Sequence, residues 1–166
     1  MEDRAKIGGH ASAAAGAIVA YWLADGYVIG LPVLALAALW NPLIVFLAAF
    51  TIVVLINLAA CRWINTAWSS WAGGSSGARI ERQLDKVRPT RAGRAATRWI
   101  ASDSDRRFAA AAALTCAIVA VTLARSVGGR PLTSHRVHLA AVSYGLFFVG
   151  LFTLVGVVAG NLLTAV

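Results

Sequence analysis

A single charge inside a long apolar stretch constrains this chain more than any other feature. Between Ile7 and Cys61 the only formally charged residue is Asp25, and the apolar residues around it suffice to cross a bilayer twice. A charged side chain in hydrocarbon costs about 2.5–3.5 kcal/mol on insertion scales, so Asp25 is a candidate functional residue. Of the whole chain, 59% is hydrophobic and 13% is charged. Soluble domains carry about 25% charged residues, so this composition indicates a membrane protein.

Four membrane spans are predicted from the apolar runs. Asn41-Pro42 divides the first block into spans near 18–40 and 43–61, because proline disfavours helix before it and starts helices well. The third span is predicted at 108–124 and the fourth near 139–163. The expected fold class is therefore all-α: a polytopic helical membrane protein whose four transmembrane helices form two hairpins joined by a basic cytoplasmic linker.

The chain divides into three predicted segments. Residues 1–61 hold an uncleaved N-terminal leader and the first hairpin. Residues 62–107 form a Trp/Arg-rich linker with short surface helices over 78–87 and 90–100. Residues 108–166 form the second hairpin. Ten of the fifteen basic residues lie in the linker. The positive-inside rule then places the linker and both termini in the cytoplasm, and we expect a bacterial plasma membrane. Arg125, Arg130 and Arg136 would lie outside and oppose this orientation.

Three arginines of the linker form a predicted lipid-facing surface. Arg91, Arg94 and Arg98 follow helical spacing beside Trp99, which suits a helix lying on anionic lipid head groups. A solvated loop whose charges serve only topology is an equal alternative. Nucleic acid is not an expected partner, because no nucleic-acid-binding fold pattern accompanies the basic residues.

Asp25 has three candidate partners in the predicted spans. Counting residues from the cytoplasmic side places Asn57 and Thr115 in the same layer as Asp25, and Asn161 just below that layer. A carboxylate among amide and hydroxyl groups can bind a cation or carry a proton. Two alternatives stay open. Asp25 merely ties helices together by hydrogen bonds, or it caps a helix that begins at Gly26 and thereby breaks the first span.

Glycines that have another small residue four positions away are the predicted helix-packing positions. They are Gly26, Gly30, Gly145, Gly156 and Gly160. Small residues let helix backbones approach closely in lipid. Packing within one copy is favoured over an oligomer interface.

The expected function is a small channel or transporter for an ion or small solute. Asp25 and Asn57 would lie near its pathway, and a homo-oligomer is expected because four helices enclose little space. The alternative is a non-catalytic accessory subunit that binds other membrane proteins or anionic lipid. We expect no enzyme, cofactor or metal site, because no catalytic motif is present and the cysteines and histidines (Cys61, Cys116, His10, His135 and His138) do not supply a ligand set.

Overall fold

The computed structural model describes residues 19, 22–75, 78, 82, 85–86 and 89–165. Every regular element among these residues is a helix, as the sequence predicts. The predicted N-terminal leader and most of the short helix predicted over 78–87 lie outside the described residues.

Three long apolar helices are able to cross a membrane by length and composition. The first runs over Trp22–Leu39 and contains the π-helix η1 (Gly26–Gly30) followed by α2 (Leu31–Leu39). The other two are α3 (Pro42–Ala72) and α8 (Ser134–Thr164), each 31 residues long. At 1.5 Å per residue, 31 residues rise about 46 Å, which exceeds a hydrocarbon core of about 30 Å. This architecture is compatible with an integral membrane protein.

The turn between α2 and α3 confirms the predicted break at Asn41-Pro42. Trp40 leaves the helix with an extended backbone, and Pro42 occupies the first turn of α3. The Asn41 side chain accepts hydrogen bonds from the backbone N–H groups of Leu43 (3.0 Å) and Ile44 (3.4 Å). These groups have no partner inside the helix, so Asn41 satisfies them as an N-cap.

The third predicted span is not one helix. Residues 108–124 are divided at Cys116 between α6 (Asp105–Thr115) and α7 (Ala117–Gly128), and Cys116 has a φ of 86°. The two helices rise only about 16 and 18 Å, too little to cross the bilayer. Their alanines, such as Ala112 and Ala120, are fully buried against other helices rather than exposed to lipid. The described residues therefore contain three candidate spans, not four.

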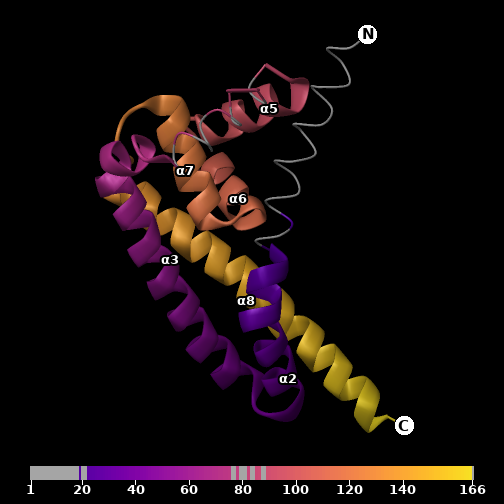
Figure 1. The fold of residues 1–166 in the computed structure, drawn as a ribbon. Helices are drawn as coiled ribbons and strands as arrows, with labels where there is room; N and C mark the ends of the chain where they lie inside the picture. Colours follow the sequence, from indigo (N-terminus) through magenta and orange to yellow (C-terminus); the bar gives the residue numbers. More distant parts are fainter. Residues whose placement is uncertain are drawn as a thin grey trace.

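The helices between α3 and α8 form a cap at one end of the three long helices. The cap consists of α5 (Arg91–Ile100), α6 and α7. Figure 1 shows α6 and α7 against the upper parts of α3 and α8, with α5 on their outer side. The α2–α3 turn and the C-terminal end of α8 lie at the opposite end of the molecule (Figure 1).

The predicted packing glycines all face a neighbouring helix of the same copy. Gly26 and Gly30 face Phe152, Gly145 faces Val54, Gly156 faces Leu34, and Gly160 faces Ala38. A Cβ atom added at Gly156 would lie only 2.4 Å from the Leu34 carbonyl oxygen. The backbones of α2 and α8 are thus in direct contact, and no lumen separates them at this level.

Candidate functional site: a carboxylate between the first span and α8

Asp25 lies in a continuous helix rather than at a break. Its backbone is helical (φ −63°, ψ −41°), and its side chain makes no capping hydrogen bond, so the capping alternative is wrong. The π-helix η1 begins at the next residue. π-Helical segments within α-helices often occur at functional sites.

Tyr144 of α8 holds the Asp25 carboxylate. Its hydroxyl donates a hydrogen bond of 2.6 Å to Asp25 Oδ2 across 119 residues of sequence. Tyr144 is fully buried and Asp25 is half-buried. The distance is that of a short O–H···O hydrogen bond. The carboxylate Oδ1 has no hydrogen-bond partner among the described residues, so one oxygen is fixed and the other is available.

Tyr144 is the partner that sequence reasoning missed. A signal was present, because Tyr144 is the only tyrosine in the apolar run 139–163 and a buried tyrosine hydroxyl usually finds a hydrogen-bond partner.

Trp22 joins this site to the tip of the cap. Its indole Nε1 donates to the Leu114 carbonyl oxygen at 3.0 Å, where α6 ends. Carbonyls in the last turn of a helix lack partners within the helix, so Trp22 satisfies one of them. The Trp22 ring also packs edge-on against Tyr144 and at a tilt against Phe148, with centroid distances of 5.8 and 5.4 Å. The Asp25–Tyr144 pair therefore lies where the first span, α8 and α6 meet.

Asn57 lies at a similar depth but on another side of α8. Val54 faces Gly145, the neighbour of Tyr144, and Asn57 follows Val54 by about one helical turn toward the cap. Asn57 is 4% exposed, and its Nδ2 donates to the Val53 carbonyl at 2.9 Å. Its buried Oδ1 has no partner among the described residues. No hydrogen bond within the described chain joins Asn57 to Asp25.

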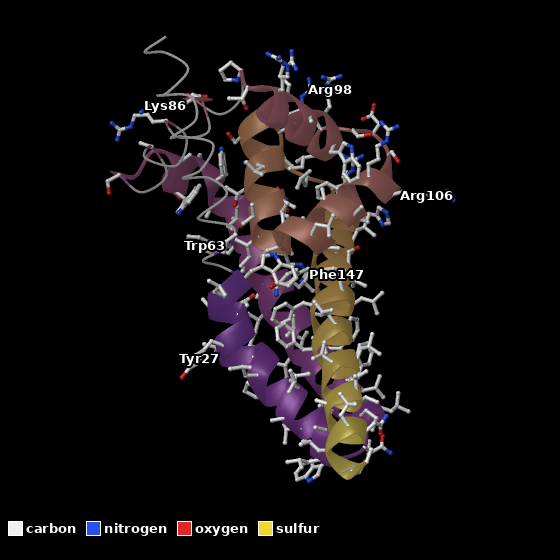
Figure 2. The ribbon with its side chains drawn as sticks, turned by 90° about the vertical axis from the view of Figure 1, so that its right-hand side faces the viewer. Tyr27, Trp63, Lys86, Arg98, Arg106 and Phe147 are labelled. Carbon is white, nitrogen blue, oxygen red and sulfur yellow. The ribbon has the colours of Figure 1, made fainter. Side chains whose placement is uncertain are left out.

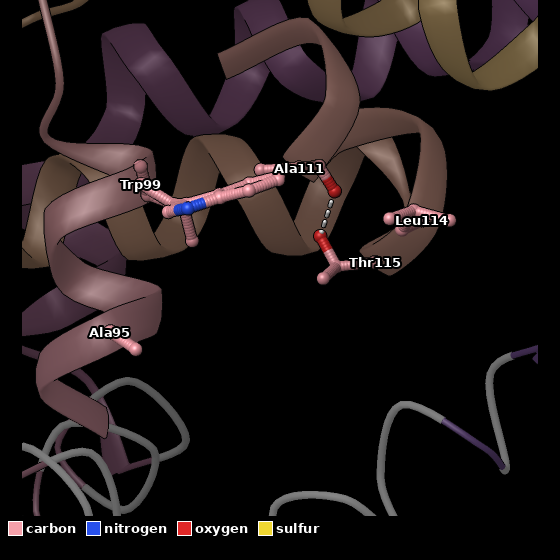
Figure 3. A pocket seen from close by; sticks show the side chains of 6 residues that line it. Ala95, Trp99, Ala111, Leu114 and Thr115 are labelled. Atoms are coloured by element: carbon pink, nitrogen blue, oxygen red, sulfur yellow. Dashed lines mark hydrogen bonds between the residues drawn. The ribbon is translucent and has the colours of Figure 1, made fainter. Parts of the chain in front are cut away.

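Thr115 contributes to the cap rather than to the carboxylate site. Its hydroxyl donates to the Ala111 carbonyl at 2.7 Å within α6. Figure 3 shows this bond beside Trp99 and Leu114, in a shallow open pocket of about 210 Å³ lined mostly by apolar residues. Because the hydroxyl is bonded within its own helix, Thr115 has no described contact with Asp25.

Asn161 is far from the carboxylate. Its neighbour Gly160 faces Ala38, which lies thirteen residues beyond Asp25, or about 20 Å along the helix. Asn161 is exposed at the end opposite the cap. The predicted proximity of Asn161 to Asp25 is therefore wrong, because α8 runs away from the cap side.

The predicted lipid-facing arginines lie on the outer side of the cap. Arg91, Arg94 and Arg98 are exposed, and Arg94 donates to the Pro89 carbonyl. Arg98 lies at the end of the molecule farthest from the C-terminal part of α8 (Figure 2). The α6 and α7 helices lie between α5 and the long helices, and contact of these arginines with lipid head groups stays a prediction.

The charged groups nearest the start of α8 serve structure. Asp105 at the start of α6 is bonded by His135 (3.1 Å) and by Arg136 (3.3 Å). His138 lies 3.0 Å from an Arg62 nitrogen. Within the described ranges, no group of three or more His, Cys, Asp or Glu residues has metal-binding geometry.

The site thus combines a half-buried carboxylate, a tyrosine that fixes one of its oxygens, and a π-helix in the next five residues. This arrangement can take up a proton or a small cation at the available oxygen. Comparison of the chain with family models, with curated proteins and with solved structures finds no match in any of the three.

Proposed function

We propose that this chain is a small integral membrane transporter or channel subunit for a proton or small cation, with Asp25 as the ion-binding residue. One observation carries the proposal. The only Asp or Glu in the three long apolar helices is half-buried. A buried tyrosine holds one of its oxygens, and the other has no hydrogen-bond partner among the described residues. Ionisable residues inside membrane spans are rare and commonly mark ion pathways or proton relays.

Tyr144 and η1 would link ion binding to movement of the first span. The Tyr144 hydroxyl bond to Asp25 joins the first span to α8, so an ion bound at the carboxylate would compete with this bond and weaken the tie between the two helices. A π-helix closes each hydrogen bond over five residues where an α-helix uses four, so η1 is a place where the register of the span can change. Loading of Asp25 and a shift of the first span are therefore coupled in this proposal.

The ion path would lie between copies of the chain. The α2 and α8 backbones are in contact at Gly156 and Gly160, which leaves no passage between them within one copy. We therefore propose that the transporting form is a homo-oligomer. Cross-linking in native membranes that yields only monomer would contradict this part of the proposal.

Proton flux in liposomes tests the role of Asp25. The purified protein is reconstituted with a pH-sensitive dye, and acidification is followed under an imposed gradient. Asp25→Asn should abolish the flux, Tyr144→Phe should reduce it, and Thr51→Val should leave it unchanged. Thr51 is a matched control because its hydroxyl lies in a span but bonds only to the Leu47 carbonyl of its own helix. Flux through a folded Asp25→Asn variant at the wild-type rate would refute the assignment.

A second candidate function is a non-catalytic accessory subunit. The close contact of α2 and α8 favours it, because a sealed bundle suits a helix-packing role better than a pore. Absence of flux for protons, Na⁺ and K⁺ under any gradient, with a stable larger membrane protein that co-purifies, would support this function against the transporter.

We further propose that the cap faces the cytoplasm. Thirteen of the fifteen basic residues lie between Arg62 and Arg136, in the cap, its connections and the adjoining helix ends. The positive-inside rule then places the cap and the start of the first span inside. With three spans, the C-terminal end of α8 lies outside, unlike in the four-span prediction.

A further inference from the structure

We propose that Arg125 binds an anionic oxygen ligand of the phosphate class where the cap meets α3. The proposal does not depend on the transport function of Asp25. It starts from one buried cation. Arg125 lies in the last turn of α7, is 8% exposed, and its Nε is fully buried without a hydrogen-bond partner among the described residues.

No acidic side chain of the described chain neutralises this cation. The sequence contains no Asp or Glu in residues 26–80 or after residue 105. Of the acids that the structure describes between these ranges, Asp105 is already bonded by His135 and Arg136, and neither Asp85 nor Asp103 forms an ion pair with Arg125. Arginine stays protonated in proteins, so burial cannot remove the charge of Arg125. A buried charge is costly unless it is paired and hydrogen-bonded, and an external anion would supply this pairing.

The Trp68 ring positions the guanidinium but does not satisfy it. Arg125 Cζ lies 5.8 Å from the centroid of the Trp68 ring. This cation–π contact orients the planar group, yet it provides no acceptor for the N–H groups. A guanidinium presents its N–H groups as a fork that matches the oxygens of a phosphate.

The loop that follows α7 is held against α3 by hydrogen bonds and has open space beside it. The Asn65 side chain of α3 donates to the Leu132 carbonyl at 3.0 Å and accepts from the Leu132 N–H at 2.8 Å. These two bonds hold the loop that follows α7 against α3. Beside Gly128 and Gly129 no described atom lies within 4 Å of the position that a Cβ would occupy. This open space therefore borders the end of α7, about one turn after Arg125.

The depth of Arg125 suits a lipid phosphate. Trp63, Trp68 and Trp71 follow the apolar part of α3, and tryptophans concentrate at the level of the head groups. Arg125 contacts the middle one of these three residues. A phospholipid head group and a free phosphate from the aqueous phase share the same chemistry, so the experiment must separate these two sources.

Thermal unfolding in detergent tests the site. The full chain is titrated with phosphatidylglycerol, with phosphatidylcholine or with inorganic phosphate, and the unfolding temperature is followed. We expect phosphatidylglycerol to raise the unfolding temperature more than phosphatidylcholine does. Arg125→Gln should weaken the apparent affinity about ten- to a hundredfold, because a charge-assisted hydrogen bond is lost. Arg130→Gln, a change at an exposed arginine of the same loop, should keep the full response.

The outcomes separate the sources and the alternative role. An equal response to inorganic phosphate would support the site and assign its ligand to the aqueous phase, whereas a response to phosphatidylglycerol alone would assign it to lipid. The same response in Arg125→Gln as in wild type would overturn the proposal and leave Arg125 as a group that packs on Trp68. If Arg125→Gln does not fold, native mass spectrometry of the wild type decides. Equal retention of phosphatidylglycerol and phosphatidylcholine would then overturn the proposal.

Discussion

Gly156→Ala should destabilise the protein by forcing α2 and α8 apart. A Cβ at residue 156 would lie 2.4 Å from the Leu34 carbonyl oxygen and 3.0 Å from Ala37 Cβ. Ordinary van der Waals contact begins at 3.4 Å, so the first of these distances falls short by about 1 Å (3.4 minus 2.4). The obstacle is the backbone of α2, which cannot rotate away as a side chain could. The two helices must therefore separate or shift.

The cost follows from the contacts that this separation weakens. A gap of 0.5–1 Å forfeits about a quarter to a half of the dispersion energy of each affected atom pair. Forced overpacking in well-packed interiors costs about 1–3 kcal/mol. Alanine gains up to about 1 kcal/mol over glycine from helix propensity, which offsets part of this loss. We expect a net loss of about 1–2 kcal/mol in the free energy of unfolding.

Gly150→Ala is the matched control for this prediction. A Cβ at residue 150 would lie 3.9 Å from the Phe46 ring, which is an ordinary contact. This variant gains helix propensity without overpacking, so it should be neutral or slightly stabilised. Reversible unfolding in mixed micelles, followed by circular dichroism, compares the two variants. Equal stability of Gly156→Ala and Gly150→Ala would refute direct backbone contact between α2 and α8.

The remaining predictions concern the carboxylate, a helix cap and the topology. Tyr144→Phe should lower the free energy of unfolding by about 1 kcal/mol, as for a hydrogen bond within a membrane bundle. In an Asp25→Ala background, the same change should lower the free energy of unfolding by little more. Additive losses would show that the two groups are not coupled. Asn41→Ala removes the N-cap of α3 and should cost about 1 kcal/mol in the same unfolding assay, whereas an unchanged midpoint would contradict the capping role. An impermeant maleimide should label Thr164→Cys in intact cells and Ser75→Cys only after permeabilisation; labelling of both from one side would contradict three spans.

Local chemistry made part of this fold predictable. The turn at Asn41-Pro42 depends on the missing N–H of proline and on the reach of one side chain, both of which are visible in the sequence. Asp25 stands out in the sequence because it is an isolated charge in an apolar run, and its role stays a prediction. The packing glycines were found because close backbone approach in a membrane requires small residues.

The rest depended on information that hydropathy does not hold. The hydropathy of an alanine-rich run is the same whether lipid or protein covers it. The span predicted at 108–124 therefore includes alanines that are buried against α3 and α8. No glycine or proline marks the break at Cys116, which has a φ of 86° although it is not a glycine. The Tyr144–Asp25 bond depends on how two helices are rotated against each other, which spacing along one chain cannot specify.

The break at Cys116 also resolves a conflict in the charge pattern. In a four-span topology, Arg125, Arg130 and Arg136 fall outside and oppose the basic linker. Because α6 and α7 are too short to cross a bilayer, these three arginines share the cap end with Arg62, which lies beside His138 at the start of α8. The described residues at the opposite end, around the α2–α3 turn and the end of α8, carry no charge. No charge at the opposite end therefore opposes the orientation proposed above. For the same reason, Asn161 lies at the end opposite the cap, whereas the four-span topology predicts it at the cytoplasmic end.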